Sequence, residues 1–140
     1  MAGYSGTPLP QKLGIKPGLA VVTIKAPTNY RRLLGTIPQG VVLSDCLKPN
    51  SNFVHVFIKK RNELEQRLSV LRKKIADTGT VWVSWPKRSS GVSTDVTEDR
   101  IRDVALALGF VDVKVCAIDE TWSGLKLMVR RRNRKPSVRK

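Results

Sequence analysis

Hydrophobic positions along the chain follow two periods, one typical of buried β-strands and one typical of amphipathic helices. The run FVHVFI at residues 53–58 is apolar apart from His55, which predicts a parallel strand covered on both of its faces. Directly after it, apolar residues recur every three or four positions over residues 64–75, which predicts a helix that buries one face. Asn62 and Glu65 form the expected capping pair of this helix. The rest of the chain repeats the strand–helix unit with shorter elements.

The remaining elements follow from the same two periods and from the residues that bound them. The expected strands span residues 19–25, 41–45, 81–85, 111–118 and 125–129, and the expected helices span residues 8–13, 29–34 and 98–108. Thr7 and Thr28 are the expected caps of the first two helices, and residues 94–97 offer several for the last. Apolar and polar residues alternate over residues 111–118, as is typical of an edge strand. Trp122-Ser123-Gly124 is expected to turn the chain into an antiparallel last strand.

Strands and helices alternate along the chain until this terminal hairpin. Such an order requires a mostly parallel sheet with right-handed crossovers and helices on both faces. We therefore predict an α/β fold, with a single three-layer domain of about six strands over residues 1–129. Residues 130–140, RRRNRKPSVRK, are predicted to form a basic C-terminal tail outside this domain.

The chain is strongly basic, with 26 Lys and Arg residues against 11 Asp and Glu, for a net charge of +15. The tail contributes seven of these positive charges, so the folded body keeps a net charge of +8. A field of this sign attracts phosphates, nucleic acid or an anionic membrane surface. No apolar run is long enough to span a bilayer, and MAGYSGTPLP does not read as a secretory signal, so we expect a cytoplasmic protein. Cys46 and Cys116 are expected to be buried thiols in a reducing compartment, and a disulfide between them is the alternative.

Several common catalytic motifs are absent from the sequence. His55 is the only histidine, so a histidine-based metal site or catalytic triad has nothing to pair with it. The chain has no G-x-x-x-x-G-K-[ST] loop and no G-x-S-x-G elbow, which removes those NTPase and hydrolase mechanisms. We expect no metal, and the lack of a complete catalytic motif favours a protein that is not an enzyme.

The layout resembles the class I methyltransferase version of the Rossmann fold. The resemblance is carried by GIKPG at 14–18, GFVDV at 109–113 and the antiparallel closing strand. It implies a Rossmann-like domain with the strand order second, first, third, fourth, sixth, fifth, in which one helix–strand unit is missing between Asp45 and Phe53. Four longer words resemble a bacterial family catalogued as domain of unknown function 3052, which implies this fold and no assigned activity. These words are YSGTPL at 4–9, WPK at 85–87, TDVTED at 94–99 and DETWSGLK at 119–126.

Ligands of such sheets bind beyond the carboxyl ends of the strands, where the strand order reverses. Here that switch point lies between the first and third strands, which makes Thr28 and Asn29 candidate ligand-binding residues. A methyltransferase would have a glycine-rich turn after its first strand, but KAPTNY at 25–30 has no glycine, and its proline removes a backbone donor. Asp45 matches the acidic residue that binds ribose hydroxyls in that fold; the alternative is an aspartate that simply ends a strand. Bound S-adenosylmethionine is therefore possible but disfavoured, and no cofactor is expected.

Basic residues follow the carboxyl ends of several neighbouring strands. We expect them to form a basic rim at one edge of the sheet, able to hold a phosphate or nucleic acid. Solvated surface charge is the competing explanation. The basic rim comprises Arg31, Arg32, Lys59, Lys60, Arg61, Lys87 and Arg88.

The polar stretch after the fourth strand could meet the end of the fifth strand. From the first come Lys87, Ser89 and Ser90, and from the second come Asp119, Glu120, Trp122 and Ser123. A Ser–Lys nucleophile pair is one interpretation of this group. The other is structural, with Thr94, Asp95 and Thr97 as helix caps and Trp122 packed over the end of the hairpin.

Three functional hypotheses remain. The first is a non-catalytic module that binds an anionic partner, either nucleic acid or a phosphorylated ligand, at the carboxyl edge of the sheet. The second is a reduced methyltransferase-like protein that depends on, or merely binds, S-adenosylmethionine. The third is a protein-interaction module that uses Trp85, Trp122 and the polar loop between them.

Overall fold

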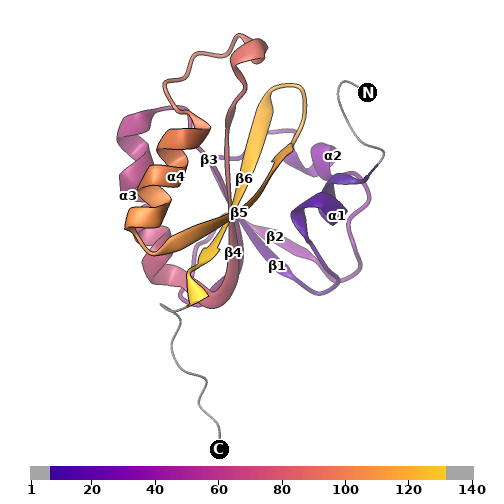
Figure 1. Cartoon of the computed structure of the whole chain (residues 1–140). Coiled ribbons are helices and arrows are strands. Elements are labelled where there is room, and N and C mark those ends of the chain that lie inside the picture. The colour runs from indigo at the N-terminus through magenta and orange to yellow at the C-terminus, as the bar shows by residue number, and fades with distance from the viewer. Residues whose placement is uncertain (1–6, 132–140) are drawn as a thin grey trace, which may run out of the picture.

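The computed structural model describes residues 7–131, which form a six-stranded sheet with helices on both faces (Figure 1). The strands are β1 (Ala20–Ile24), β2 (Val42–Ser44), β3 (Ser51–Phe57), β4 (Ile75–Pro86), β5 (Phe110–Ala117) and β6 (Trp122–Val129). The helices are α1 (Leu9–Leu13), α2 (Tyr30–Leu34), α3 (Arg61–Lys74) and α4 (Glu98–Ala107), with a short 3₁₀ turn, η1 (Arg88–Ser90), after β4. None of the helices in this part of the chain is long and apolar enough to cross a membrane.

The strand order along the sheet is β2-β1-β3-β4-β6-β5. Strands β1 to β4 are parallel, and β6 runs antiparallel to both β4 and β5. The predicted fold class and strand order are both confirmed. Only residues 45–50 connect β2 to β3, where the resemblance implied a missing helix–strand unit. The predicted tail lies outside the described residues from position 132 onward.

Two hydrophobic cores lie on opposite faces of the sheet. Helices α3 and α4 cover one face, and the shorter α1 and α2 cover the other (Figure 1). Strand β4 serves both, because Val81 and Val83 point into the first core while Trp82 points into the second. Trp82 is completely buried and its indole N–H donates to the Leu13 carbonyl at 2.9 Å, which ties α1 to the sheet.

The two long central strands begin earlier than the sequence predicts. Strand β4 starts at Ile75, directly after α3, so Gly79 lies within the strand. A Cβ at Gly79 would lie 3.0 Å from the Ser51 carbonyl oxygen, so this close approach of two backbones requires glycine. Strand β6 starts at Trp122, which places Gly124 inside the sheet and not in a turn. The prediction of a turn at residues 122–124 was wrong, because Gly124 is used for close packing inside the sheet.

Most of the predicted helix caps are wrong, although the helices themselves are present. Asn62 lies inside α3, whose N-cap is Lys60, and no side chain of that N-cap residue closes the helix. Helices α1 and α2 have Pro8 and Asn29 at their N-caps, in place of Thr7 and Thr28, also without a side-chain bond. The cap of α3 is supplied instead from a distant loop, described below.

The sheet edges and the cysteines complete the comparison. Strand β5 is an edge strand as predicted, with Val113 and Val115 exposed on it.

Both cysteines are free thiols. Cys116 is half-buried and burial raises the pKa of its thiol, but Cys46 is exposed, because β2 ends at Ser44 and leaves it on the surface connection. The expectation that both thiols are buried was therefore wrong for Cys46.

Candidate functional site

The carboxyl ends of the parallel strands meet at one edge of the sheet, the edge at the top of Figure 1 where α2 and the η1 loop lie. The strand order reverses there between β1 and β3. A cleft of about 420 Å³ opens at this point, and we call it the switch-point cleft. It is lined by Lys25, Ala26, Pro27, Thr28, Phe57, Lys59, Lys60, Glu63 and Trp122.

Three lysines give the switch-point cleft its charge. Lys25 follows β1, while Lys59 and Lys60 follow β3, so the positive charges reach the cleft from two neighbouring strands. Glu63 is the one acidic residue in the lining. Of these residues, Lys59, Lys60, Thr28 and Trp122 were predicted, and Lys25 was missed. Its position directly after a strand at the switch point was the signal that could have found it.

Phe57 and Trp122 give the switch-point cleft an aromatic wall. Phe57 packs edge-to-face against Trp122, with ring centroids 4.9 Å apart, and stacks on His55 at 4.3 Å. Tyr30 completes the cluster with edge contacts to His55 and Phe57. Because these rings are buried against one another, the wall of the cleft is set by packing and not by a mobile loop.

A buried polar network lies beneath this wall. His55 Nδ1 is 2.8 Å from the Tyr30 hydroxyl and His55 Nε2 is 2.7 Å from Ser84 Oγ, with His55 and Ser84 completely buried. A neutral imidazole can satisfy both contacts, since it donates from one nitrogen and accepts at the other. Burial lowers the pKa of His55 to about 3 and raises the pKa of Tyr30.

The sequence did not indicate these structural hydrogen-bonding partners of His55. Its partners were not foreseeable because they come from α2 and β4, which only the sheet brings together. The group is nevertheless not a nucleophilic triad, because it contains no carboxylate and its serine and histidine are sealed from solvent. Its role is to satisfy polar groups in the core.

A second depression, which we call the β1–β2 hollow, lies beside the switch-point cleft. It is lined by Thr23, Ala26, Pro27, Tyr30, Arg31, Leu43, Ser44 and Asp45, and has a volume of about 420 Å³. The predicted ribose-binding candidate Asp45 is exposed here, next to Arg31 of the basic rim. Asn29 and Arg32 are also exposed, on α2 and at its start, but neither lines the two depressions.

The loop after β4 is fastened to the start of α3. Asp95 Oδ1 accepts a hydrogen bond from the Arg61 backbone N–H at 2.7 Å, and Thr94 Oγ1 donates to the Lys59 carbonyl at 2.6 Å. Thr97 caps its own helix by accepting from the Arg100 N–H at 3.2 Å. The structural interpretation of this loop therefore holds, with one change: Asp95 and Thr94 serve α3, and only Thr97 caps α4.

The Ser–Lys pair of the alternative interpretation is not formed. Ser90 Oγ donates to the backbone carbonyl of Lys87 at 2.6 Å and accepts from the Val92 N–H, so this hydroxyl closes its own turn. Ser89 and Arg88 are exposed on η1. Arg88 also lines a polar pocket of about 660 Å³ formed by Trp85 and residues 91–98.

The end of the β5–β6 hairpin does meet this loop, as predicted. The Lys87 N–H donates to the Thr121 carbonyl at 2.7 Å. Asp119 Oδ1 accepts from the N–H groups of Thr121 and Trp122, so its carboxylate shapes the turn. Glu120 is exposed at the tip, and Ser123 pairs with Trp85 in the sheet.

The tryptophans of the interaction hypothesis are largely hidden. Trp85 is 7% exposed in the core beneath α3 and α4, and Trp122 is 8% exposed in the opposite core. Neither offers the broad exposed face that a contact surface for a protein partner requires.

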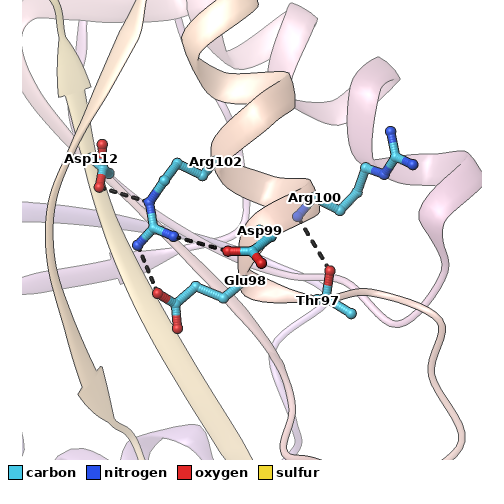
Figure 2. A network of polar contacts seen from close by, with 6 residues as sticks. All are labelled: Thr97, Glu98, Asp99, Arg100, Arg102 and Asp112. Atoms are coloured by element: carbon cyan, nitrogen blue, oxygen red, sulfur yellow. Dashed lines mark hydrogen bonds and ion pairs between the residues drawn. The ribbon is translucent and has the colours of Figure 1, made fainter.

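An ion-pair network that the sequence did not suggest joins α4 to β5 (Figure 2). Arg102 donates from Nη2 to Glu98 Oε2 at 2.6 Å and from Nε to Asp112 Oδ2 at 2.8 Å. The hydrogen bond from Arg102 lowers the pKa of Asp112, and the bonds to Glu98 and Asp112 raise the pKa of Arg102. Because it lies away from the switch-point cleft and its charges are paired, we assign it to stability and not to ligand binding.

Within residues 7–131, no cluster of three or more His, Cys, Asp or Glu side chains is placed to hold a metal ion.

Solved structures of similar fold are known, although no sequence family is matched. No family model matches the chain, and no curated protein matches it. Among solved structures, a proposed type 11 methyltransferase from Sulfolobus solfataricus superposes with a TM-score of 0.60 and 13% identity, covering 94% of this chain and 93% of that one.

Two further methyltransferases are similar over slightly less of their length. Ribosomal protein L11 methylase from Lactobacillus delbrueckii subsp. bulgaricus has a TM-score of 0.54 and 12% identity, covering 88% of this chain and 76% of that one. The 1,6-didemethyltoxoflavin-N1-methyltransferase from Burkholderia thailandensis was solved with bound 1,6-didemethyltoxoflavin and S-adenosylhomocysteine. It has a TM-score of 0.55 and 13% identity, covering 87% of this chain and 75% of that one. The chain therefore has the Rossmann-like fold of the class I S-adenosylmethionine-dependent methyltransferases. At these identities the likeness concerns the fold alone.

The three lysines of the switch-point cleft disfavour a cationic ligand there. S-adenosylmethionine carries a positively charged sulfonium, and a cleft with Lys25, Lys59 and Lys60 repels a cation. In addition, Pro27 lacks a backbone N–H that could bind a ligand at the turn after β1. Asp45 in the β1–β2 hollow is the one feature that suits a ribose.

Proposed function

We propose that this protein is a non-catalytic ligand-binding module of methyltransferase-like fold that takes a phosphorylated ligand in the switch-point cleft. The observation that carries the proposal is the meeting of Lys25, Lys59 and Lys60 in one cleft at the point where ligands of doubly wound sheets bind. A cleft of about 420 Å³ has the size of a small-molecule site.

The groups near the cleft support a binding role without catalysis. Nothing in its lining forms a nucleophile–base pair, since Thr28 is its one hydroxyl and Glu63 its one acid. His55 lies behind the aromatic wall, bonded on both nitrogens, and its lowered pKa keeps it neutral at physiological pH. Lysines and a packed aromatic wall suit binding and orientation of an anion.

S-adenosylmethionine or its demethylated product is the second candidate ligand. It is favoured by the fold, by the bound S-adenosylhomocysteine in a protein of similar fold, and by Asp45 in the β1–β2 hollow. The demethylated product lacks the sulfonium charge, so it avoids the repulsion described above. Membership in the family of unknown function 3052 remains a prediction from the four sequence words.

Ligand binding can be measured by calorimetry and thermal shift with pyrophosphate, ATP, S-adenosylmethionine and S-adenosylhomocysteine. We expect ATP or pyrophosphate to bind, and the double variant Lys59→Ala/Lys60→Ala to bind at least about a hundredfold more weakly, because charged hydrogen bonds contribute about 1.5–3 kcal/mol each. The matched control is Lys73→Ala/Lys114→Ala, which removes the same charge from two exposed positions outside the cleft.

The proposal fails if the wild type binds no phosphorylated compound, or if both double variants lose affinity equally. Binding of S-adenosylhomocysteine that depends on Asp45 would establish the second candidate instead. Retention on heparin that falls steeply with salt, without binding of the small phosphates, would point to nucleic acid at the basic rim.

A further inference from the structure

Lys25 has an unusual backbone for its residue type. It follows the last residue of β1 and has φ 61, in the left-handed region that side chains with a Cβ disfavour. Among the described residues, the other positive-φ positions are six glycines and Asn50, and asparagine tolerates this region well. Elsewhere, then, the chain uses a residue suited to the conformation, and at Lys25 it does not.

The position of Lys25 links this strain to the switch-point cleft. The residue lies directly after β1, which pairs with β3, and Lys25, Lys59 and Lys60 all line the cleft. Glycine there would relieve the backbone and let a ligand approach it closely. Strained residues persist where the surrounding structure holds them, and they concentrate at ligand sites.

We propose that Lys25 determines which ligand the switch-point cleft accepts: its amine completes a three-lysine clamp for a phosphorylated compound and excludes a sulfonium cofactor. This inference rests on the proposed function and names its ligand class more closely. Three ammonium groups drawn from two strands match a diphosphate or triphosphate better than a single carboxylate. The backbone strain at Lys25 is the cost of placing the third amine at the end of β1.

Three substitutions at one position separate the amine from the backbone. Lys25→Gly removes both the amine and the strain, Lys25→Ala removes the amine and keeps the strain, and Lys25→Arg keeps a positive charge. The affinities for ATP, pyrophosphate, S-adenosylmethionine and S-adenosylhomocysteine are measured for each variant, with the melting temperature of the unliganded protein.

We expect Lys25→Gly and Lys25→Ala to bind ATP about tenfold more weakly, and Lys25→Arg to stay within about threefold of the wild type. We expect Lys25→Gly to melt about 3 °C higher than Lys25→Ala, because only glycine relieves the backbone. The ratio of S-adenosylmethionine to S-adenosylhomocysteine affinity should rise in both variants without the amine, since the repelled sulfonium is present only in the former.

Two failures are distinguishable. If the wild type binds ATP and loses it in Lys59→Ala/Lys60→Ala, but Lys25→Gly stays within about twofold of the wild type, the inference on Lys25 is wrong and the proposed function stands. If the wild type binds no phosphorylated compound, both are wrong. A lower melting temperature for Lys25→Gly than for Lys25→Ala would show that the backbone at Lys25 is not strained.

Discussion

Asp95 closes the start of helix α3 from a loop thirty-four residues further along the chain, by accepting the Arg61 backbone N–H at 2.7 Å. The first amides of a helix have no partner within it, and a carboxylate also complements the positive end of the helix dipole. Thr94 reinforces the contact by donating to the Lys59 carbonyl. The loop after β4 thereby anchors the backbone that carries Lys59 and Lys60 into the switch-point cleft.

Replacing this carboxylate should destabilise the whole fold. We expect Asp95→Ala to lower the free energy of unfolding by about 1 kcal/mol, the usual effect of losing a helix cap, as measured by urea denaturation. Asp103→Ala is the control, because this substitution removes the same charge from an exposed position on α4. Equal stability of the two variants would show that the Asp95 contact contributes nothing.

His55 should make stability depend on pH. Its pKa is lowered from 6.5 to about 3 by burial, so between these values the unfolded chain binds a proton that the folded chain does not. Stability contributed by the neutral ring is therefore complete above pH 6.5 and is lost as the pH falls toward 3. The expected slope approaches about 1.4 kcal/mol per pH unit in the middle of that window.

Urea denaturation at a series of pH values measures this slope directly. His55→Gln cannot titrate, so its unfolding free energy should vary less between pH 4 and pH 6 than that of the wild type, whatever its absolute stability. Parallel pH profiles for the two proteins would mean that His55 takes up its proton in the folded state.

Arg102 and Asp112 should show a modest, salt-sensitive coupling. Their side chains are 29% and 32% exposed, and the Nε–Oδ2 distance is 2.8 Å. A double-mutant cycle with Arg102→Ala and Asp112→Ala should give about 0.5–1 kcal/mol, decreasing in 1 M salt, a rough figure typical of partly exposed pairs. The cycle of Arg102 with Asp99 is the internal control and should give almost nothing, since Asp99 is 93% exposed and 3.4 Å away. Similar coupling in both cycles would contradict this assignment.

Gly124 should not tolerate a methyl group. A Cβ there would lie 2.9 Å from Ile118 Cδ1 and 3.1 Å from Trp82 Cε3, and both side chains are buried. We expect Gly124→Ala to cost about 1–3 kcal/mol by overpacking, even though alanine reduces the entropy of the unfolded chain. Ile118→Val removes the nearest atom, so the double variant should recover part of the loss in a thermal melt. No recovery would place the strain elsewhere.

Local sequence patterns were sufficient for the architecture. The apolar run of β3 and the helical spacing in α3 reflect burial on faces that the element itself defines. The alternation in β5 predicted its place at the sheet edge, although its burial does not alternate and Val113 and Val115 are exposed. The order of elements, together with the resemblance to methyltransferases, then predicted the strand order β2-β1-β3-β4-β6-β5. It also predicted that basic residues such as Lys59 would follow the carboxyl ends of neighbouring strands.

Contacts between distant segments escaped these patterns. Asn62 looked like the cap of α3 because a capping pair is a local motif, yet Asp95 supplies the bond. The hydrogen-bonding partners of His55 were not predicted, because they lie twenty-five and twenty-nine residues away in the chain.

By itself, the sequence determined the fold class and the placement of basic residues after neighbouring strands, because these depend on periodicity and on the order of elements. Only the tertiary structure decided that Lys25 joins Lys59 and Lys60 in one cleft, that its backbone adopts φ 61, and that Asp95 caps α3. The physical reason is the difference in geometric precision between the two kinds of interaction. Hydrophobic burial involves a whole face of an element and does not depend on the exact position of single atoms. A hydrogen bond or a lysine clamp requires particular atoms, from elements far apart in the chain, to meet within a few ångströms.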